Sequence, residues 1–372
     1  TKIKIWMTPQ KDEKKYQIAL SLIDGVGDIV GKKLLAQFGS AKGVFFAKRK
    51  ELQKIHGIGS ILVDAILSTD VLKRAEQELK FIKKESIQHI FYGDKDYPNR
   101  LKQCEDAPLN LFFKGNIDWE KEKFISIVGT RKATSFGKSF TEKLVKELAP
   151  YQPVIVSGLA YGIDIAAHKA ALKYGLKTIT VFAHGLDRVY PSAHASIAKE
   201  IQQSGGLVTE FLSGTNSDRQ NFPKRNRIVA GLSDATIVIE SAAKGGSLIT
   251  ADIANSYNRE VFAVPGSPAQ MQSKGCNYLI KTQQAILLES SADIVKGLNW
   301  DVKEKTIQQS MFVELSINEQ RIIDFLSDKE MHIDAIVEGL EWSFSKVANE
   351  LLQAEFKGLI LSLPGKVYKK NI

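Results

Sequence analysis

Short apolar runs recur through the middle of the chain and alternate with stretches of helical periodicity. Six runs predict buried strands, at Phe124–Val128, Val154–Val156, Thr178–Phe182, Leu207–Thr209, Ala235–Ile239 and Glu260–Val264. Continuous apolar runs are typical of parallel strands that are covered on both faces. Helical patterns fill most of the gaps, for example at Phe136–Leu148 and Ile163–Tyr174. This alternation predicts an α/β fold with a parallel sheet and helical crossovers.

The first 80 residues read as short helices, and two of their turns share a pattern. Each has an apolar helix end, a Gly-x-Gly turn and a second apolar helix, with turns at Gly25–Gly27 and, about 32 residues later, at Gly57–Gly59. This is a helix-hairpin-helix arrangement, whose tight turns expose amides at a helix N-terminus toward a phosphate. The alternative is a small bundle whose glycines serve only its turns. The pattern leaves both interpretations open.

The last 60 residues or so show three helical patterns and a short strand pair, which together indicate a winged-helix domain. The helices are predicted at Ile317–Leu326, Ile333–Gly339 and Ser343–Phe356, and the strands at Leu359–Leu363 and Val367–Lys370. Such domains often bind duplex DNA through the third helix. From residue 311 onward, however, the chain carries ten acids and seven bases. Repulsion from phosphates therefore favours a contact with protein.

Shifts in composition along the chain predict its domain boundaries and show which part carries the positive charge. We expect a helical domain over residues 1–80, a sheet domain over 81–298, a polar linker over 299–310 and a winged-helix domain over 311–372. The net charge is +9, and because the last part carries −3, the first 310 residues carry +12. A basic body favours a polyanionic partner, although a lysine-rich solvated surface would give the same total.

Several classes of protein are disfavoured by what the sequence lacks. It has no run of 18 apolar residues and no apolar signal core near Thr1, so we expect no membrane span and a cytoplasmic location. Cys104 and Cys276 have no partner spacing and are expected to be reduced thiols. The Walker pattern is absent, and Gly-x-Gly-x-x-Gly does not follow the first strand. We therefore expect no cofactor.

Candidate catalysts and metal ligands are scarce. No histidine–cysteine cluster has the spacing of metal ligands, so we expect no metal. His168 lies in an alanine-rich helix, where we expect it to pack or to orient the loop of Asp164. His184 is expected to shape its own turn, because neither histidine has an evident nucleophile beside it.

Loops rich in glycine and small hydroxyls follow three of the predicted strands. Ligands of open parallel sheets bind beyond the carboxyl ends of the strands, where these loops gather. Glycine allows close approach of the backbone, arginine forks onto a phosphate, and a helix N-terminus attracts an anion. The candidate contacts are Gly129, Thr130, Arg131 and Thr134 after the first strand, Ser157 and Gly158 after the second, and Lys244, Gly246 and Ser247 after the fifth. Three such loops at one edge predict a phosphate site.

The loop after the fourth strand decides between classes of phosphate ligand. It runs from Gly214 to Gln220 and continues as NFPKRNR before an apolar helix. Its candidate contacts are Phe222, Lys224, Arg225, Asn226 and Arg227. Cations follow a phosphate backbone, and an aromatic ring stacks on an unpaired base for about 1–3 kcal/mol. The pattern favours a single strand, with the alternative that the phenylalanine fills the core.

The order of these motifs resembles the DNA-processing protein A family, also called DprA or Smf. The resemblance covers about two hundred residues and is very specific. Its motifs are YGDKDYP from Tyr92, SGLAYGID from Ser157, HGLDRVYP from His184, FPKRNRIVAGLS from Phe222, GSLITA from Gly246, VFAVPG from Val261 and GCNYLI from Gly275. Three positions depart from the family's pattern, at Thr130, Ala183 and Gly245. The third weakens the expectation of a side-chain donor at that point.

The resemblance implies an extended Rossmann-like domain that binds single-stranded DNA, protects incoming DNA in natural transformation and helps to load RecA on it. It also implies a homodimer, a helical N-terminal domain and a C-terminal winged helix. By motif position, the strand of DNA is expected against Arg131, Phe222, Lys224, Arg225, Asn226 and Lys244.

The main alternative is an enzyme of a related Rossmann-like fold that binds or hydrolyses nucleotides. Such relatives typically carry a Pro-Gly-Gly-x-Gly-Thr turn followed by glutamate, whereas residues 243–250 read AKGGSLIT with no glutamate nearby. We therefore expect no catalysis. A sequence-specific regulator acting through the winged helix is disfavoured by the acidic balance of that domain. Replacing Arg131 or Arg225 by alanine is expected to weaken binding to single strands without changing the fold.

Overall fold

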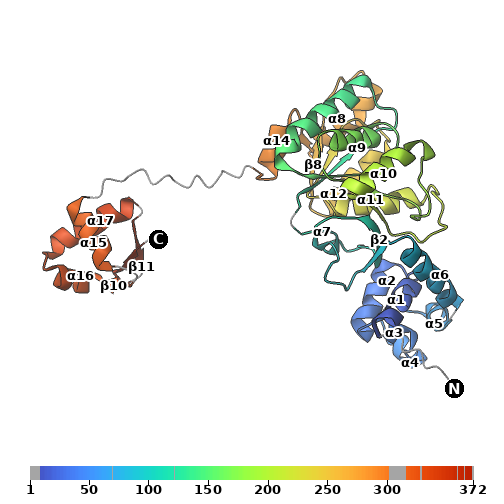
Figure 1. Ribbon diagram of the computed structural model, residues 1–372, viewed down its shortest axis with the longest axis horizontal. Helices are drawn as coiled ribbons and strands as arrows, with labels where there is room; N and C mark the ends of the chain where they lie inside the picture. Colours follow the sequence, from blue (N-terminus) through green and yellow to red (C-terminus); the bar gives the residue numbers. More distant parts are fainter. Residues whose placement is uncertain are drawn as a thin grey trace. The chain divides into compact units, whose positions relative to one another are not determined.

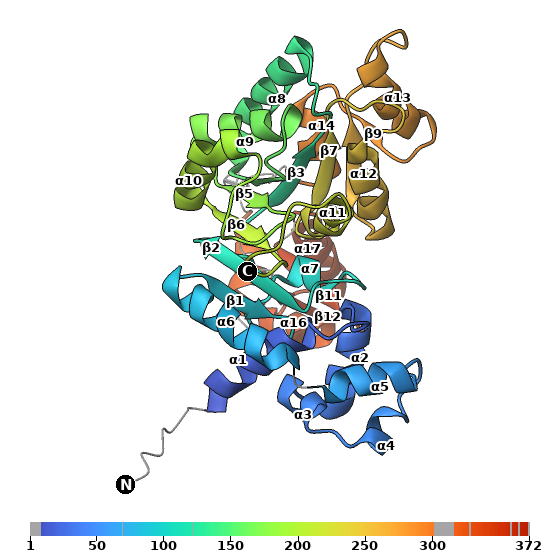
Figure 2. The ribbon, with the colours of Figure 1, turned by 90° about the vertical axis from the view of Figure 1, so that its right-hand side faces the viewer.

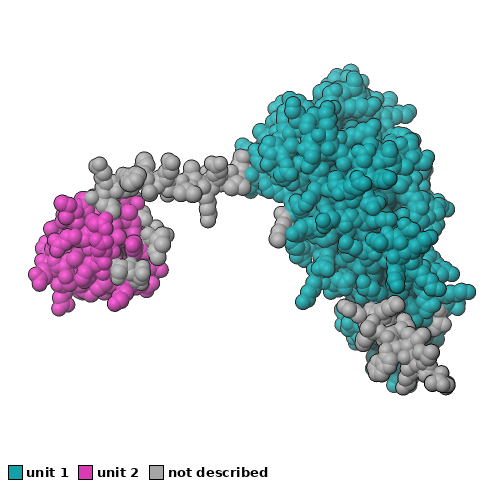
Figure 3. Space-filling model, viewed as in Figure 1, with its two compact units in different colours: residues 1–300 teal, residues 301–372 magenta. Residues whose placement is uncertain are grey.

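The computed structural model describes residues 9–68, 70–120, 122–300, 316–326, 329–357, 359–363 and 365–370. The chain divides into two compact units, residues 1–300 and residues 301–372, which Figure 3 colours separately. Of the linker predicted at 299–310, residues 301–310 lie outside the described residues.

The first unit begins with a group of helices joined by tight turns (Figure 1). They are α1 (Pro9–Leu20), α2 (Asp28–Phe38), α3 (Ala41–Phe45), α4 (Arg49–Leu52), α5 (Ser60–Leu67) and α6 (Asp70–Lys84). Both predicted hairpins are present, because α2 and α5 each begin directly after a Gly-x-Gly turn. Gly25 and Gly57 adopt positive φ values of 81° and 87°, which side chains with a Cβ rarely adopt.

A nine-stranded sheet forms the body of this unit. Its strands are β1 (Gln88–Phe91), β2 (Asn110–Gly115), β3 (Phe124–Val128), β4 (Val154–Ser157), β5 (Thr178–Val181), β6 (Gly206–Thr209), β7 (Ala235–Val238), β8 (Glu260–Ala263) and β9 (Ile286–Leu287). The strand order is β1-β2-β6-β5-β4-β3-β7-β8-β9. All six predicted strands are confirmed to within one residue at each end. The sheet is mixed, because β1 and β2, which were not predicted, pair antiparallel at one end.

Helices cover both faces of the sheet, as the periodic patterns predict (Figure 2). They are α7 (Asn99–Lys102), α8 (Ser135–Leu148), α9 (Ile163–Lys173), α10 (Ala195–Ser204), α11 (Asn221–Gly231), α12 (Gly246–Ser256), α13 (Lys274–Lys281) and α14 (Ser291–Gly297). Apolar side chains of α8, α9 and α14 form one core with the sheet, and those of α7, α11, α12 and α13 form another on the opposite face. Burial on both faces explains why the central strands are continuous apolar runs.

The connections of the parallel strands place a crevice beside β3. The chain steps from β3 through β4 and β5 to β6 on one side, and then returns to β7 on the other side of β3. The helical connections therefore leave the carboxyl ends of β3 and β7 in opposite directions. Open α/β sheets bind ligands at such a switch point.

The N-terminal helices pack against the antiparallel end of the sheet. Leu109, directly before β2, lies in one apolar cluster with these helices, and its main-chain N–H donates to Asp28 Oδ1 at 2.8 Å. Gly31 in α2 permits this close packing, since a Cβ there would lie 2.3 Å from Leu109 Cδ1. The predicted boundary at residue 80 falls inside α6 and inside the first compact unit, so a separate helical domain stays a prediction.

The second unit has the predicted winged-helix arrangement. It comprises α15 (Ile317–Leu326), β10 (Met331–His332), α16 (Ile333–Leu340), α17 (Phe344–Phe356), β11 (Ile360–Leu363) and β12 (Val367–Lys370). The three strands pair in the order β10-β12-β11. Its own apolar core joins all three helices to β11.

Candidate nucleic-acid interface

An open cavity of about 850 Å³ lies at the switch point, beyond the carboxyl ends of β3, β4 and β7. Its walls come from the loops that the sequence singled out. The predicted contacts that line it are Gly129, Thr130, Arg131, Phe222, Arg225, Asn226, Lys244, Gly246 and Ser247. With Ala160 of the loop after β4, residues from four separate segments thus meet at one place, although the sequence separates the first and the last by more than 100 positions.

The segment from Asn221 to Arg227 is the first part of α11, and this corrects the prediction that it is a loop. Pro223 fits because a proline in the first helical turn loses no intrahelical hydrogen bond. Successive residues of a helix point about 100° apart, so the three cations of this segment cannot share one surface. Arg225 lines the cavity, whereas Lys224 and Arg227 line a different hollow beside α2.

Arg225 is buried and bridges the carboxyl ends of β4 and β5. Its Nη1 donates to the carbonyl oxygen of Gly158 at 2.8 Å and to that of Val181 at 2.6 Å. A Cβ on Gly158 would lie 2.0 Å from this nitrogen, so only glycine leaves room for the guanidinium. Burial lowers the pKa of Arg225 and raises the pKa of Asp164, and each charge opposes the shift of the other. That Arg225→Ala leaves the fold unchanged stays a prediction, and these buried interactions argue against it.

Phe222 forms part of the cavity wall between two guanidinium groups. The guanidinium carbon of Arg131 lies 5.2 Å from the ring centroid, and that of Arg225 lies 5.9 Å from it. The ring is half-buried and lines the open cavity, so it is not the core plug that the sequence left as an alternative. Both distances are within the range of cation–π attraction.

The loop after β7 presents a helix N-terminus to the cavity. Gly246 begins α12, and no atom lies within 4 Å of where its Cβ would stand. Lys244 is exposed beside it, whereas the Ser247 hydroxyl donates to Ser241 Oγ at 2.9 Å. The free first amides and the helix dipole favour an anion at this point.

Two predicted hydroxyl contacts, Thr134 and Ser157, hold the walls instead of lining the cavity. The Thr134 hydroxyl donates to Glu240 and accepts from the N–H of Gly137, which caps α8. Ser157 is fully buried, and its hydroxyl donates to the carbonyl oxygen of Ile127 at 2.7 Å.

Arg227 joins the N-terminal helices to the sheet. Its Nη2 contacts Asp28 Oδ2 at 3.0 Å and also Glu210. Arg227 and Glu210 are largely shielded from solvent, and burial raises the pKa of Glu210 to about 7. These ion pairs neutralise the charge of Arg227, which the sequence led us to predict as a DNA contact.

Sequence reasoning missed Arg219, which lines the cavity and is exposed. The sequence offered one signal for it, a single basic residue within the polar run that follows β6. Among the described residues, none of the cavity's exposed cations, Arg131, Arg219 and Lys244, has an ion-pair partner. Unpaired cations around an aromatic wall can bind phosphates and stack a base.

The two histidines near the cavity are buried, and each makes a hydrogen bond through its Nδ1. His168 Nδ1 lies 2.7 Å from Thr178 Oγ1, and His184 Nδ1 lies 2.8 Å from the carbonyl oxygen of Gly185. Burial lowers the pKa of His168 to about 3 and also lowers that of His184. Neither lines the cavity, in agreement with the packing and turn-shaping roles predicted for them.

Other sequence expectations concern metals, thiols and membranes. Within the described residues, no three histidine, cysteine, aspartate or glutamate side chains are grouped to hold a metal ion. Cys104 and Cys276 are buried and unbonded to each other. No helix in the described part of the chain has both the length and the apolarity to cross a membrane.

Comparison with known proteins places this geometry in a family. The family model described as DNA recombination-mediator protein A matches residues 88–299, and the DprA winged helix domain model matches residues 313–366. Protein Smf of Synechocystis is 29% identical over 394 residues, which covers 96% of this chain and 99% of that protein.

Two solved structures are similar over much of the chain. DprA of Streptococcus pneumoniae aligns with a TM-score of 0.62 and 33% identity, covering 76% of this chain and 97% of that one. A structure of DNA processing protein A from Helicobacter pylori, whose subject is single-stranded DNA binding, aligns with a TM-score of 0.52 and 30% identity, covering 58% and 96%. With both family models matched in order, the chain belongs to the DNA recombination-mediator protein A family, also called DprA or Smf.

Proposed function

We propose that the chain binds single-stranded DNA in the cavity at the switch point. The observation that carries the proposal is a set of three exposed cations, without ion-pair partners in the described part of the chain, around the half-buried ring of Phe222. Arg131, Arg219 and Lys244 bind phosphates, and the ring stacks on an unpaired base. The proposed contacts are the predicted residues that line the cavity, except for the buried Arg225, together with Arg219. A relative of similar fold from Helicobacter pylori binds single-stranded DNA, which supports the same ligand class.

The bound strand continues from the cavity into a neighbouring groove between α8 and α9. Arg131 belongs to both hollows, and the groove adds the exposed bases Lys132, Lys138 and Lys169. None of these three lysines has an ion-pair partner among the described residues. A duplex is too wide and too stiff to present bases to Phe222, so the arrangement favours single strands.

The cellular role that we propose is the handling of incoming single strands in the cytoplasm during natural transformation, including their transfer to RecA. The family's description as a recombination mediator supports this role. We also propose a homodimer. Its support is a group of exposed apolar side chains at the β9 end of the sheet, namely Met271, Tyr278, Ile286 and Leu287.

The proposal assigns no reaction to the cavity. Its ionisable lining residues are four cations and the carboxylates of Asp164 and Asp252, and the buried histidines lie elsewhere. Asp164 is committed to the N–H groups of Gly158 and Ala160 and to the charge of Arg225. Asp252 is an exposed carboxylate of α12, and neither a histidine nor a cysteine is among the described residues that line the cavity.

Fluorescence anisotropy of a labelled oligothymidylate tests this function. We expect tight binding that unlabelled single strands displace and that duplex or mononucleotides displace far less. Arg131→Ala should weaken binding about tenfold, since it removes a charge-assisted contact worth about 1.5 kcal/mol. Lys199→Ala, an exposed lysine of α10 outside the cavity, is the matched control and should bind normally. Equal displacement by duplex at matched salt would contradict the proposal.

A further inference from the structure

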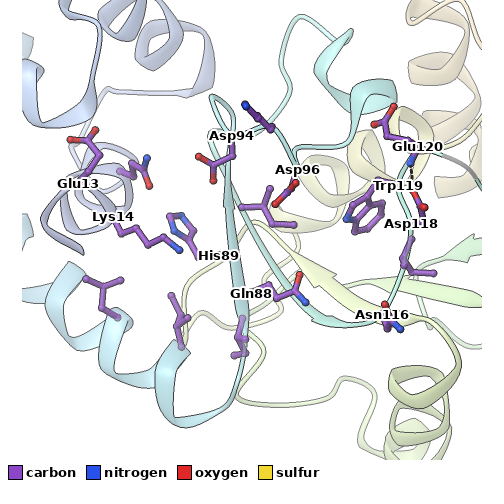
Figure 4. A pocket seen from close by; sticks show the side chains of 17 residues that line it. Glu13, Lys14, Gln88, His89, Asp94, Asp96, Asn116, Asp118, Trp119 and Glu120 are labelled. Carbon is purple, nitrogen blue, oxygen red and sulfur yellow. Dashed lines mark hydrogen bonds between the residues drawn. The ribbon is translucent and has the colours of Figure 1, made fainter. Parts of the chain in front are cut away.

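A second large cavity, of about 890 Å³, lies along the outer strand of the sheet, far from the proposed DNA site in the strand order. It is lined by β1, by α1 and α6, and by the loop that follows β2. In Figure 4 the side chains of Glu13 and Lys14 lie on one side of β1, and those of Asp96 and Trp119 lie on the other. The proposed DNA-binding function uses none of these residues.

One edge of β1 is open. Among the described strands, β1 pairs only with β2, in an antiparallel register that sets His89 opposite Phe112. In the same register, the N–H of Tyr92 donates to the carbonyl oxygen of Leu109. Hydrogen-bonded positions alternate along an antiparallel strand, so residues 89 and 91 are not hydrogen-bonded to β2. The main-chain groups of residues 89 and 91 therefore point away from β2.

Hydrogen bonds within the chain satisfy the outward main-chain groups of one of these two residues, Phe91. The N–H of Phe91 donates to Asp94 Oδ2 at 2.9 Å, and its carbonyl oxygen accepts from the N–H of Asp94 at 2.8 Å. Nothing in the described part of the chain pairs with the outward N–H and carbonyl of His89. An open strand edge of this kind is a template for another strand.

Two side chains of the cavity lining also carry buried acceptor atoms that have no partner among the described residues. Asn110 Nδ2 donates to the carbonyl oxygen of Gln17, so Asn110 Oδ1 accepts from His89 Nε2 at 2.6 Å. The other ring nitrogen, His89 Nδ1, is then a bare acceptor, and burial lowers the pKa of this histidine to about 4. Gln17 Oε1 is a second unpartnered acceptor. His89 is 7% exposed and Gln17 9%, so the cavity calls for a ligand that brings donors.

The charge of the cavity lining indicates which kind of hydrogen-bond donor the ligand carries. The lining includes five carboxylates, those of Glu13, Asp94, Asp96, Asp118 and Glu120, against two lysines, Lys14 and Lys95. This net −3 stands on a chain whose total charge is +9. Apolar side chains, including Leu79, Ile82 and Trp119, supply the rest of the lining.

We propose that β1 is a docking site for an extended, basic segment of a partner protein, which adds to the sheet as a tenth strand. Its main chain pairs with the free groups of His89, its lysine or arginine side chains meet the carboxylates and the two bare acceptors, and its alternate apolar residues contact the cavity's apolar lining. Strand addition to an open edge draws affinity from the main chain and specificity from alternate side chains. DNA is excluded by the charge of the site.

A fluorescein-labelled peptide of eight residues that alternates lysine and valine tests the proposal on the full chain without DNA. We expect saturable binding. Two control peptides isolate its causes: one replaces the lysines by glutamates, and one keeps the charge but replaces the two central valines by prolines, which cannot pair in a ladder. Both should bind at least tenfold more weakly. Equal binding by the proline peptide would overturn strand addition.

Two protein variants locate the site. Asp96→Lys should weaken peptide binding at least fivefold, whereas Glu200→Lys, the same charge change on exposed α10, should leave it within twofold. Gln17→Leu removes a bare acceptor whose loss should not lower the melting temperature, yet it should weaken binding about threefold. If Asp96→Lys and Glu200→Lys behave alike, the proposal is overturned.

A shortened chain that begins at Pro9 identifies the occupant. The preceding residues, TKIKIWMT, alternate lysine and isoleucine and so have the chemistry of the proposed ligand. We expect the shortened chain to bind the peptide within threefold of the full chain. An affinity at least tenfold higher would assign the edge to this chain's own first residues and overturn the proposal of a separate partner.

Discussion

Arg131 and Arg225 line the same cavity but have different tasks. Arg131 is exposed and free to meet a phosphate, whereas the Arg225 side chain is committed to two carbonyl oxygens and to the charge of Asp164. The sequence shows only that both are bases near an aromatic residue. Burial, which decides between contact and support, depends on Gly158 and on the end of β5, far away along the chain.

At the residue scale, Arg225→Ala should lower the free energy of unfolding by about 3–5 kcal/mol, because it leaves the Asp164 carboxylate buried and unpaired. The double variant Arg225→Met/Asp164→Asn should recover most of this loss. Urea titration of each variant measures the effect. A stable Arg225→Ala protein that has lost only its affinity for DNA would make Arg225 a contact residue.

Phe222→Ala should weaken oligothymidylate binding by about 1–3 kcal/mol if the ring stacks on a base. Its half-buried position predicts a smaller loss of stability than for a core phenylalanine. Phe222→Tyr keeps the stacking surface and is the matched control. Anisotropy titration that gives equal affinities for Phe222→Ala and wild type would return the ring to a packing role.

At the scale of elements, the sequence predicts best where one physical signal dominates. Continuous burial makes β3, β4, β5, β6, β7 and β8 apolar runs, so periodicity alone finds them. The short strand β1 lies at an edge and carries polar residues, so it gives no such signal. The start of α11 was missed because its first turn is polar and contains Pro223, features that loops share with helix N-termini.

The contact of Arg227 with Asp28 and Glu210 is predicted to hold α2 against the sheet. Arg227→Ala should therefore expose the N-terminal helices to limited proteolysis without weakening DNA binding more than twofold. Arg227→Lys keeps the charge but loses the fork that reaches two carboxylates, so it should be intermediate. A tenfold loss of DNA affinity in folded Arg227→Ala would contradict this assignment.

At the scale of the whole molecule, charge is distributed unevenly, with +12 in the first 310 residues and −3 in the remainder. The salt dependence of binding counts the cations that contact DNA. Three phosphates at the cavity predict a logarithmic slope of about −2, and six phosphates along the cavity and the α8–α9 groove predict about −4. The triple variant Lys132→Ala/Lys138→Ala/Lys169→Ala should bring the steeper slope back to the shallower one. A slope near zero would exclude a phosphate track.

Ultraviolet cross-linking of the full chain to oligothymidylate, followed by mass spectrometry of the linked peptides, tests the central claim most directly. Bases stacked at Phe222 should link to peptides from residues 217–226, with further links in residues 242–250. Links confined to the N-terminal helices or to the winged helix, with none at the cavity, would contradict the account.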